Sequence, residues 1–297
     1  MNEQPMNPFL AVLTTWKSYF DNYYEGLGTT YERVLLHKLF KRLDARFGIT
    51  SVLEVPSFGM TGVSGINSMW WAMQGKQVTV IDTDRERIAF IENVWKEVGL
   101  DARIMFHEDF ANLPFAEDAF DVSWNFASLW FVPELPRFAS ELRRITRKVI
   151  FISVPNDSGW GYRLREKYGR ELPGIFLENI RPETVVQQFA CEGWKLQETG
   201  LFDVPPWPDI AMKKEDLFQK IGLQKIMQLL SRLKKRKNDD QDQESSTTIV
   251  DFYAGRAPHL EEEIMRFAIL ENAPNFFKRI WAHHRYFIFA PAKKGEA

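Results

Sequence analysis

The sequence predicts an α/β protein built on a mostly parallel, doubly wound sheet, and three observations lead to that fold class. Short apolar and β-branched runs alternate with segments of helical period between residues 48 and 156. The run 148–154 has the composition of a central parallel strand, which is apolar because helices cover both of its faces. With 297 residues, 45% of them apolar, the chain is long enough to bury one large core.

Each element of the first half follows from its local pattern. Because crossovers between parallel strands are right-handed, the loops that follow the strands meet at one edge of the sheet, where ligands bind. Strands are expected over residues 51–55, 78–82, 102–106, 120–124 and 148–154, and helices over 8–47, 63–73, 85–98 and 134–145.

The second half carries weaker patterns, interrupted by three prolines within 205–208 that forbid regular structure. Expected there are a helix over 181–191, a sixth strand over 194–204, an amphipathic helix over 213–233, a helix over 260–270 and a final strand over 285–290. The expected organisation is a single domain made of an N-terminal helical lid (1–47), a core (48–204), a helical insertion before the last strand (205–280, with a mobile loop at 234–250) and the last strand (281–292).

Composition excludes several classes of function. The net charge of -2 provides no field that would attract nucleic acid. A single cysteine, Cys191, rules out an internal disulfide framework and indicates a reducing compartment. The charge-free stretch 55–75 contains too many polar residues for a membrane span, and the N-terminus lacks the pattern of a signal peptide. A soluble, cytoplasmic protein is therefore expected.

The turn after the first expected strand is the first candidate binding element. Glu54 leads into the residues Pro56, Ser57, Phe58 and Gly59. Glycine in such a turn lets the backbone approach a ligand closely, and the helix behind it offers unpaired N–H groups to a negative group. A turn with a purely structural role is an equal alternative.

Two further elements follow the second and third strands. Asp82 ends the second strand, where an acid accepts hydrogen bonds from ribose hydroxyls in nucleotide-binding sheets. Asp82, Thr83 or Asp84 could instead cap the helix that follows. After the third strand, Asp109 could accept from the amino group of an adenine and Phe110 could cover a ring face; a surface loop with a buried Phe is the structural alternative.

In this order the residues resemble the class I S-adenosylmethionine-dependent methyltransferases, most closely the ubiquinone/menaquinone C-methyltransferase-like branch (methyltransferase type 11-like). The resemblance extends over residues 30–156, and the family usually has glycine where Pro56 and Phe58 stand. The residues that carry it are the turn 54–62, the strand end Val80, Ile81 and Asp82, the loop Asp109 with Leu113, Pro114 and Phe115, then Phe120 and Asp121, and the segment 141–156.

The resemblance implies a Rossmann-like, seven-stranded sheet and S-adenosyl-L-methionine as the cofactor. No obligatory catalytic residue is implied, because the sulfonium methyl is already activated and its transfer mainly requires alignment. The implied cofactor contacts are Glu54, Pro56, Ser57, Phe58 and Gly59 beside the methionine part, Asp82 and Thr83 at the ribose, Asp109 and Phe110 at the adenine, and Asn125 and Phe126 near the transferring methyl group.

The expected function is methyl transfer to a small or medium, apolar or aromatic molecule. One alternative is a non-catalytic, regulatory protein that binds S-adenosylmethionine. Another is a lipid or quinone methyltransferase at a membrane surface, held by peripheral contact through the basic run 234–237. The near-neutral charge argues against a nucleic-acid substrate. The oligomeric state is open.

Histidines and tyrosines give two last expectations. The adjacent pair His283 and His284 suggests a metal site, but neighbours in a strand point to opposite sides, so no metal site is expected. Aromatic residues make up 14% of the chain and gather in residues 1–31. Tyr24 and Tyr31 are therefore expected to face the cofactor from the lid, with ordinary helix packing as the alternative.

Overall fold

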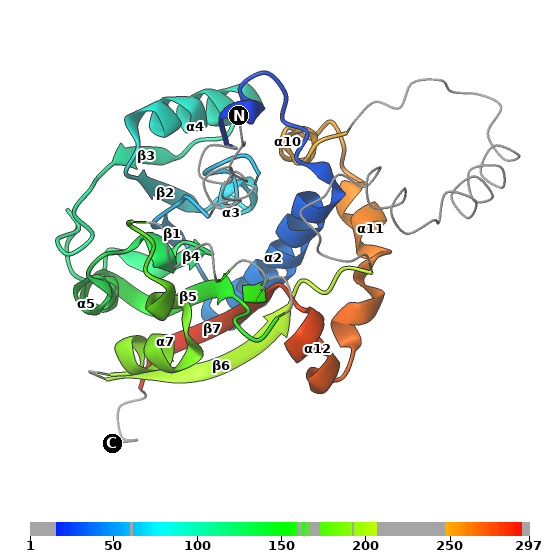
Figure 1. Ribbon diagram of the computed structural model, residues 1–297. Helices are drawn as coiled ribbons and strands as arrows, with labels where there is room; N and C mark the ends of the chain where they lie inside the picture. Colours follow the sequence, from blue (N-terminus) through cyan, green and yellow to red (C-terminus); the bar gives the residue numbers. More distant parts are fainter. Residues whose placement is uncertain are drawn as a thin grey trace, which may run out of the picture. The chain divides into compact units, whose positions relative to one another are not determined.

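A seven-stranded sheet in the order β3-β2-β1-β4-β5-β7-β6 forms the centre of the molecule (Figure 1). Every neighbouring pair of strands is parallel except the two that involve β7. This arrangement confirms the predicted doubly wound α/β fold. The strands are β1 Ser51–Glu54, β2 Gln77–Asp82, β3 Arg103–Phe106, β4 Phe120–Phe126, β5 Thr146–Pro155, β6 Trp194–Phe202 and β7 His284–Pro291.

The computed structural model describes residues 16–59, 62–159, 162–163, 166, 173–191, 193–206 and 247–292. Among these, every residue except Thr247 falls in one compact unit. The expected amphipathic helix 213–233 lies outside the described residues. The same is true of the expected mobile loop up to residue 246, while Ile249 and Val250, assigned to that loop, begin a helix instead.

Helices cover both faces of the sheet, α2, α3 and α4 on one and α5 and α7 on the other (Figure 1). Their bounds are α2 Gly26–Phe47, α3 Met69–Met73, α4 Arg85–Val98, α5 Leu135–Ile145 and α7 Pro182–Phe189. The segments outside these layers are α10 Ile249–Tyr253, α11 Leu260–Met265 and α12 Asn275–Trp281, with the 3-10 turns η1 Trp16–Tyr19, η2 Leu129–Phe131, η3 Leu177–Ile180 and η4 Ala268–Asn272.

Aromatic side chains join α2 to the sheet. The ring of Phe40 in α2 lies 4.7 Å from that of Trp124 in β4 and 5.0 Å from that of Trp71 in α3, measured between centroids. On the opposite face, Phe138 and Phe189 of α5 and α7 are fully buried in a second cluster with the apolar residues of β5 and β7. Both faces of the central strands are therefore covered, which explains their apolar composition.

The helix expected over residues 63–73 begins only at Met69, because the preceding loop is held by α2 instead. Arg33 of α2 donates to the carbonyl oxygen of Val63 at 2.8 Å, and its guanidinium binds the carboxylate of Glu25 at 2.6 and 2.8 Å. Glu25 in turn accepts a hydrogen bond from the Val63 N–H at 2.9 Å. The loop that follows β1 is thus fixed to the start of α2.

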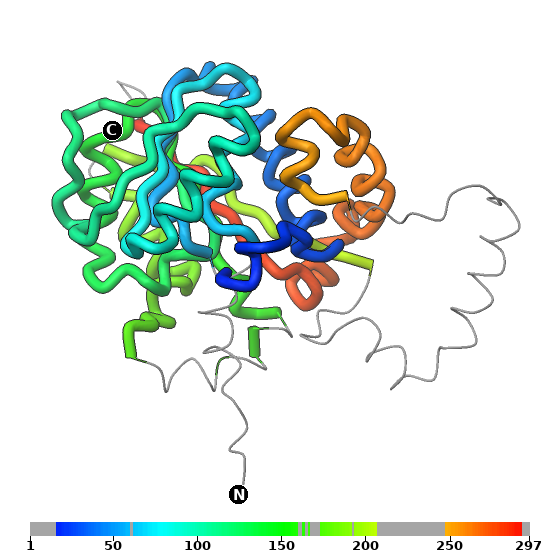
Figure 2. The backbone as a smooth tube through the Cα atoms, turned by 90° about the horizontal axis from the view of Figure 1, so that it is seen from above, coloured from blue at the N-terminus to red at the C-terminus, as the bar shows by residue number. Residues whose placement is uncertain are grey.

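The described helices α10 and α11, which come between β6 and β7 in sequence, pack against α2. Figure 2 shows α10 and α11 (orange) lying beside α2 (blue), and the two helices α11 and α2 are in contact. His37 of α2 makes the polar link: Nε2 lies 2.8 Å from the Tyr253 hydroxyl, and Nδ1 contacts the Glu261 carboxylate. Burial lowers the pKa of His37, an effect that Glu261 opposes.

Candidate functional site

Buried polar groups that lack hydrogen bonds gather at the carboxyl ends of the central strands. Glu54 ends β1, Asn125 lies near the end of β4, Ser128 follows β4 and Ser153 lies near the end of β5. Within the described part of the chain, neither carboxylate oxygen of Glu54, nor Oδ1 of Asn125, nor either serine hydroxyl has a hydrogen-bond partner. Because buried polar groups in proteins are almost always paired, their concentration at one edge indicates a ligand site.

Glu54 is the most unusual of these groups, because its side chain is fully buried. Burial raises the pKa of its carboxyl to about 7; Ser68, the positive charge of Arg33 and Asn67 oppose this shift, although none of them makes a regular hydrogen bond to the carboxylate. A buried carboxylate is costly unless a cation or a donor meets it. This site is therefore suited to a ligand that brings a positively charged group to the end of β1.

The turn between β1 and α3 passes close to the end of β4. A Cβ atom on Gly59 would lie 2.4 Å from the carbonyl oxygen of Phe126, so only glycine permits this approach. Pro56 and Ser57 are buried, and the Ser57 N–H donates to the carbonyl oxygen of Ile81 at 3.0 Å. The turn therefore lies against the ends of both β4 and β2.

Phe58, which replaces a glycine of the family pattern, packs on an arginine. Its ring is 8% exposed and lies 4.0 Å from the guanidinium carbon of Arg87 in α4. Trp16 of η1 approaches the same guanidinium at 5.5 Å, and Phe131 lies beside Phe58 at 5.2 Å. No sequence pattern signals these ring contacts, because Arg87 reads as one more charge on an amphipathic helix.

Asp82 already has a full set of partners. Arg87 donates from Nη2 to Oδ1 at 2.6 Å and from Nε to both carboxylate oxygens at 3.0 Å. The Ser57 hydroxyl donates to Oδ2 at 2.7 Å and the Asp84 N–H to Oδ1 at 2.9 Å. Thr83 is exposed, and Asp84 caps α4 by accepting from the N–H groups of its first turn. A ribose at Asp82 would require Arg87 to move away.

Asp109 and Phe110 lie at an open hollow of about 290 Å³, lined also by Glu108, Ala111 and Pro133. Asp109 accepts from the Ala111 N–H at 2.9 Å and from the Asn112 side chain at 2.7 Å, and these hydrogen bonds, that from Asn112 first, lower its pKa. Phe110 is 6% exposed and its ring lies 5.7 Å from that of Phe138 in the core.

The two lid tyrosines occupy different surroundings. Tyr31 is fully buried, and its hydroxyl donates to Oε1 of Glu271 at 2.9 Å. Burial and the Glu271 carboxylate raise the pKa of Tyr31. Tyr24 is 52% exposed. Their role toward a cofactor stays a prediction.

The geometry expected for the histidine pair is wrong. Strand β7 begins at His284, so His283 precedes the strand and the alternation of strand side chains does not apply to the pair. The Nδ1 atoms of His283 and His284 lie 2.9 and 3.2 Å from the same oxygen, Oδ2 of Asp203. The Phe126 ring, at the end of β4, lies 4.5 Å from that of His284. This buried group therefore borders the edge that carries Glu54 and Asn125.

Comparison with known proteins points to one class. The family model described as a methyltransferase domain matches residues 59–151, and no curated protein matches the sequence. Together with the seven-stranded sheet, the family match supports a class I S-adenosylmethionine-dependent methyltransferase.

Solved structures with a similar trace include three of low identity. The YcgJ protein from Bacillus subtilis is 10% identical over 88% of this chain and 99% of that chain, with a TM-score of 0.49. A SAM-dependent methyltransferase from Methanosarcina mazei is 18% identical over 51% and 82%, with a TM-score of 0.40. The MccD protein is 12% identical over 84% and 95%, with a TM-score of 0.47. Similarity at this level adds nothing to the assignment.

The residues at the edge suit the methionine part of S-adenosylmethionine, but the ion pair at Asp82 occupies the position of its ribose. The unpaired, buried carboxylate of Glu54 suits the ammonium of a methionine moiety, and Gly59 permits close approach of the backbone. At Asp82 the fit requires release of Arg87. A ribose at this position would therefore need that ion pair to open.

Proposed function

We propose that this chain is an S-adenosylmethionine-dependent methyltransferase of the type 11-like branch, acting on a small or medium, apolar or aromatic acceptor. The observation that carries the proposal is the buried carboxylate of Glu54, which has no hydrogen-bond partner within the described residues and lies where the family holds the methionine part of its cofactor. The match of residues 59–151 to a methyltransferase domain supports the same class.

Different residues of this chain would bind the methionine, ribose and adenine parts of the cofactor. Glu54 and the turn to Gly59 would hold the methionine part, Asp82 and Thr83 the ribose, and Asp109 and Phe110 the adenine. When bound, the cofactor supplies an activated methyl group, so the protein needs to align the acceptor rather than to activate the donor. The rings of Phe126 and Phe202, which are buried and 6.4 Å apart, would form an apolar wall on the acceptor side of this edge.

The partner and location of the protein form part of the proposal. An acceptor that is a small molecule fits the apolar wall, and the net charge of -2 offers no attraction for nucleic acid. No helix in the described part of the chain is long and apolar enough to cross a membrane. We place the protein in the cytoplasm. Peripheral membrane contact through the basic run 234–237 concerns residues outside those described.

A second candidate function has one observation in its favour. Arg87 occupies the carboxylate of Asp82, which the family uses for the ribose. A protein in which this ion pair persists would bind the cofactor weakly or serve as a regulatory relative without transfer. The two functions differ in whether methyl groups leave the cofactor.

Titration calorimetry with S-adenosylhomocysteine tests the proposal. The wild-type protein is expected to bind one equivalent, and Glu54→Gln to bind at least about tenfold more weakly, because a charge-assisted hydrogen bond to the ammonium is lost. Glu92→Gln is the matched control, since Glu92 is an exposed glutamate of α4. Absence of binding by the wild type would overturn the proposal.

Labelled S-adenosylmethionine separates the two candidate functions. Incubated with cell extract, the wild type is expected to transfer the label to a small molecule that organic solvent extracts. Binding of the cofactor without any labelled product would favour the regulatory alternative.

A further inference from the structure

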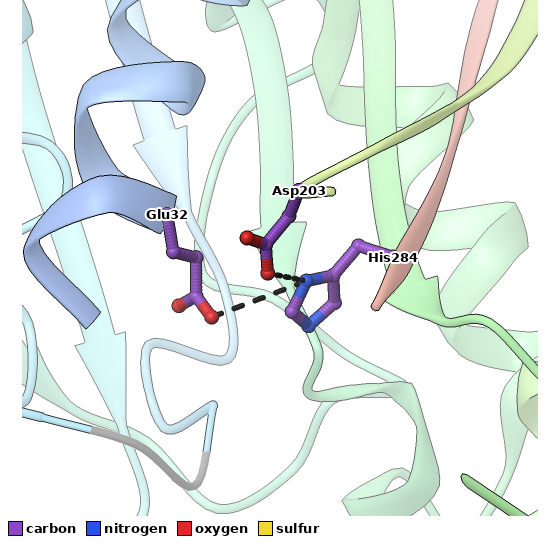
Figure 3. Close-up of side chains that lie close together, drawn as sticks. All are labelled: Glu32, Asp203 and His284. Atoms are coloured by element: carbon purple, nitrogen blue, oxygen red, sulfur yellow. Dashed lines mark hydrogen bonds and ion pairs between the residues drawn. The ribbon is translucent and has the colours of Figure 1, made fainter. Parts of the chain in front are cut away.

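Three buried side chains from distant parts of the sequence meet beside the proposed methyl-transfer edge (Figure 3). Glu32 comes from α2, Asp203 directly follows β6, and His284 is the first residue of β7. One ligand atom from each lies within 4.8 Å of the others. Nδ1 of His284 is 3.2 Å from Oδ2 of Asp203 and 3.9 Å from Oε2 of Glu32.

The backbone and the surrounding rings hold this group in place. Asp203 has a φ of +64°, an unusual value for a residue other than glycine, and its carbonyl oxygen accepts the His283 N–H at 2.9 Å. The ring of His284 packs against Phe126 at 4.5 Å and Phe202 at 5.7 Å. The carboxylate and the imidazole nitrogen are therefore directed toward one another before any ligand arrives.

Two carboxylates and one imidazole form a familiar ligand set for transition metals. Carboxylate oxygen and imidazole nitrogen bind tetrahedral Zn²⁺ at about 2.0–2.2 Å, which places neighbouring ligand atoms about 3.3–3.6 Å apart. The separation of 3.2 Å between His284 and Asp203 is close to this spacing, and the Glu32 carboxylate, at 3.9 Å from His284 and within 4.8 Å of Asp203, would need to move toward both. An imidazole ligand favours ions such as Mn²⁺, Fe²⁺, Co²⁺ and Zn²⁺ over Mg²⁺ and Ca²⁺.

We propose that Glu32, Asp203 and His284 bind a divalent transition-metal cation. The alternative is a buried network in which protonated histidine alone balances the acids. A cation balances two buried carboxylates with a single ligand, and three protein ligands leave coordination positions open. The adjacent histidines were the one local signal for such a site, and the two carboxylates had none, because Glu32 and Asp203 lie in separate segments.

If the proposed function holds, the position of the cation also indicates which chemical groups the methyl acceptor carries. The His284 ring touches Phe126, the residue that the family places near the transferring methyl group. A cation at this point would bind an oxygen of the acceptor and hold it at the transfer edge. The acceptor would then carry a hydroxyl, phenol or carboxylate group beside an apolar body.

Calorimetry of the full-length, metal-free protein with MnCl₂, ZnCl₂ and MgCl₂ tests the site directly. The wild type is expected to bind one equivalent of Mn²⁺ or Zn²⁺ and to bind Mg²⁺ at least about tenfold more weakly. Asp203→Asn, His284→Gln and Glu32→Gln are each expected to weaken Mn²⁺ binding by at least about tenfold. Equal Mn²⁺ binding by the wild type and all three variants, or none by the wild type, would overturn the cation site.

Two controls keep the result specific. Glu198→Gln changes an acid of β6 that pairs with Arg42 and Tyr286, and His259→Gln changes an exposed histidine at the start of α11. Both variants are expected to bind Mn²⁺ like the wild type. Far-ultraviolet circular dichroism of each variant identifies any that fails to fold, and the electron paramagnetic resonance spectrum of bound Mn²⁺ then provides the comparison among the folded ones.

Cofactor binding is measured separately, so that the two proposals can fail independently. Mn²⁺ binding without S-adenosylhomocysteine binding would leave the cation site standing and remove the methyltransferase. With both bound, Mn²⁺ is expected to broaden the ¹³C signal of the methyl group in labelled S-adenosylmethionine, and His284→Gln to abolish that broadening. An unbroadened signal would refute the placement of the acceptor at the cation.

Discussion

Glu54 and Asp82 end neighbouring strands of the sheet, yet their electrostatic surroundings are opposite. Glu54 is buried without a partner in the described structure, whereas the carboxylate of Asp82 is filled by Arg87, Ser57 and the Asp84 N–H. The first acid is therefore open to a cation or a hydrogen-bond donor, and the second must lose a cation before it can bind a ribose. Side-chain orientation decides this difference, and the sequence offered the same residue class at both positions.

The ion pair between Arg87 and Asp82 leads us to predict that removing Arg87 strengthens ligand binding and lowers stability. Arg87→Gln is expected to bind S-adenosylhomocysteine about three- to tenfold more tightly, because the ribose no longer competes with the guanidinium. The same change lowers thermal stability, since Asp82 loses its buried counter-charge. Calorimetry and thermal unfolding measure the two effects.

Two companion variants complete that test. Asp82→Asn is expected to weaken binding, and Arg85→Gln, which changes an exposed arginine stacked on Phe106, to leave it unchanged. If Arg87→Gln weakens binding instead, Arg87 is a ligand of the cofactor rather than its competitor.

The pKa of Glu54 predicts how stability depends on pH. The unfolded carboxyl ionises near its ordinary value of 4.5, whereas burial keeps the folded carboxyl protonated up to about 7. Between these values only the unfolded state releases its proton, so stability falls as pH rises through the window. Wild type is expected to lose about 3 kcal/mol relative to Glu54→Gln between pH 4.5 and 7. Urea unfolding at several pH values measures the difference, and identical pH profiles would contradict it.

At the scale of elements, α2 joins more of the molecule than any local pattern suggested. Its residues contact the sheet through Phe40, the β1–α3 loop through Arg33, α10 and α11 through His37, and the proposed cation site through Glu32. The sequence predicted the helix from the spacing of its apolar residues. It could not predict the polar contacts, because their partners lie in segments far along the chain.

Phe40 provides the test of this packing. Phe40→Ala is expected to lower the free energy of unfolding by about 3–5 kcal/mol, because its fully buried ring fills space among Trp71, Trp124 and Phe151. Phe276→Ala, which truncates a ring that is 73% exposed, is expected to change stability by less than about 0.5 kcal/mol. Urea denaturation of both variants makes the comparison, and equal stabilities would refute the role given to α2.

At the scale of the whole molecule, the strands were predictable and their lateral order was not. An apolar run such as that of β5 identifies a strand that is buried on both faces, and it can be recognised from neighbouring residues alone. The insertion of β7 between β5 and β6 depends instead on pairing between segments far apart in the sequence. The edge at which a ligand is expected followed from the βαβ pattern. The histidine pair suggested a metal site, but its two acidic neighbours, Glu32 and Asp203, had no local signal because they lie far from it in the sequence.

The N-terminal segment contacts α4 beside the expected ribose position. Lys17 pairs with Glu86 at 2.7 Å and Tyr23 donates to Glu97 at 2.7 Å, both on α4, while Trp16 approaches Arg87. A ligand that displaces Arg87 from Asp82 must therefore rearrange or tighten these contacts. This connects closure of the proposed lid to occupancy of the ribose position.

Hydrogen exchange with mass spectrometry measures that connection. Saturating S-adenosylhomocysteine is expected to slow amide exchange in residues 16–36 by about tenfold or more, because ligand binding stabilises locally opening segments. Peptides from α7, which covers the sheet beside β6, serve as the internal control and should change little. Arg87→Gln is expected to retain the ligand-induced slowing. Bound ligand with unchanged exchange in residues 16–36 would show that this segment packs on the core without acting as a lid.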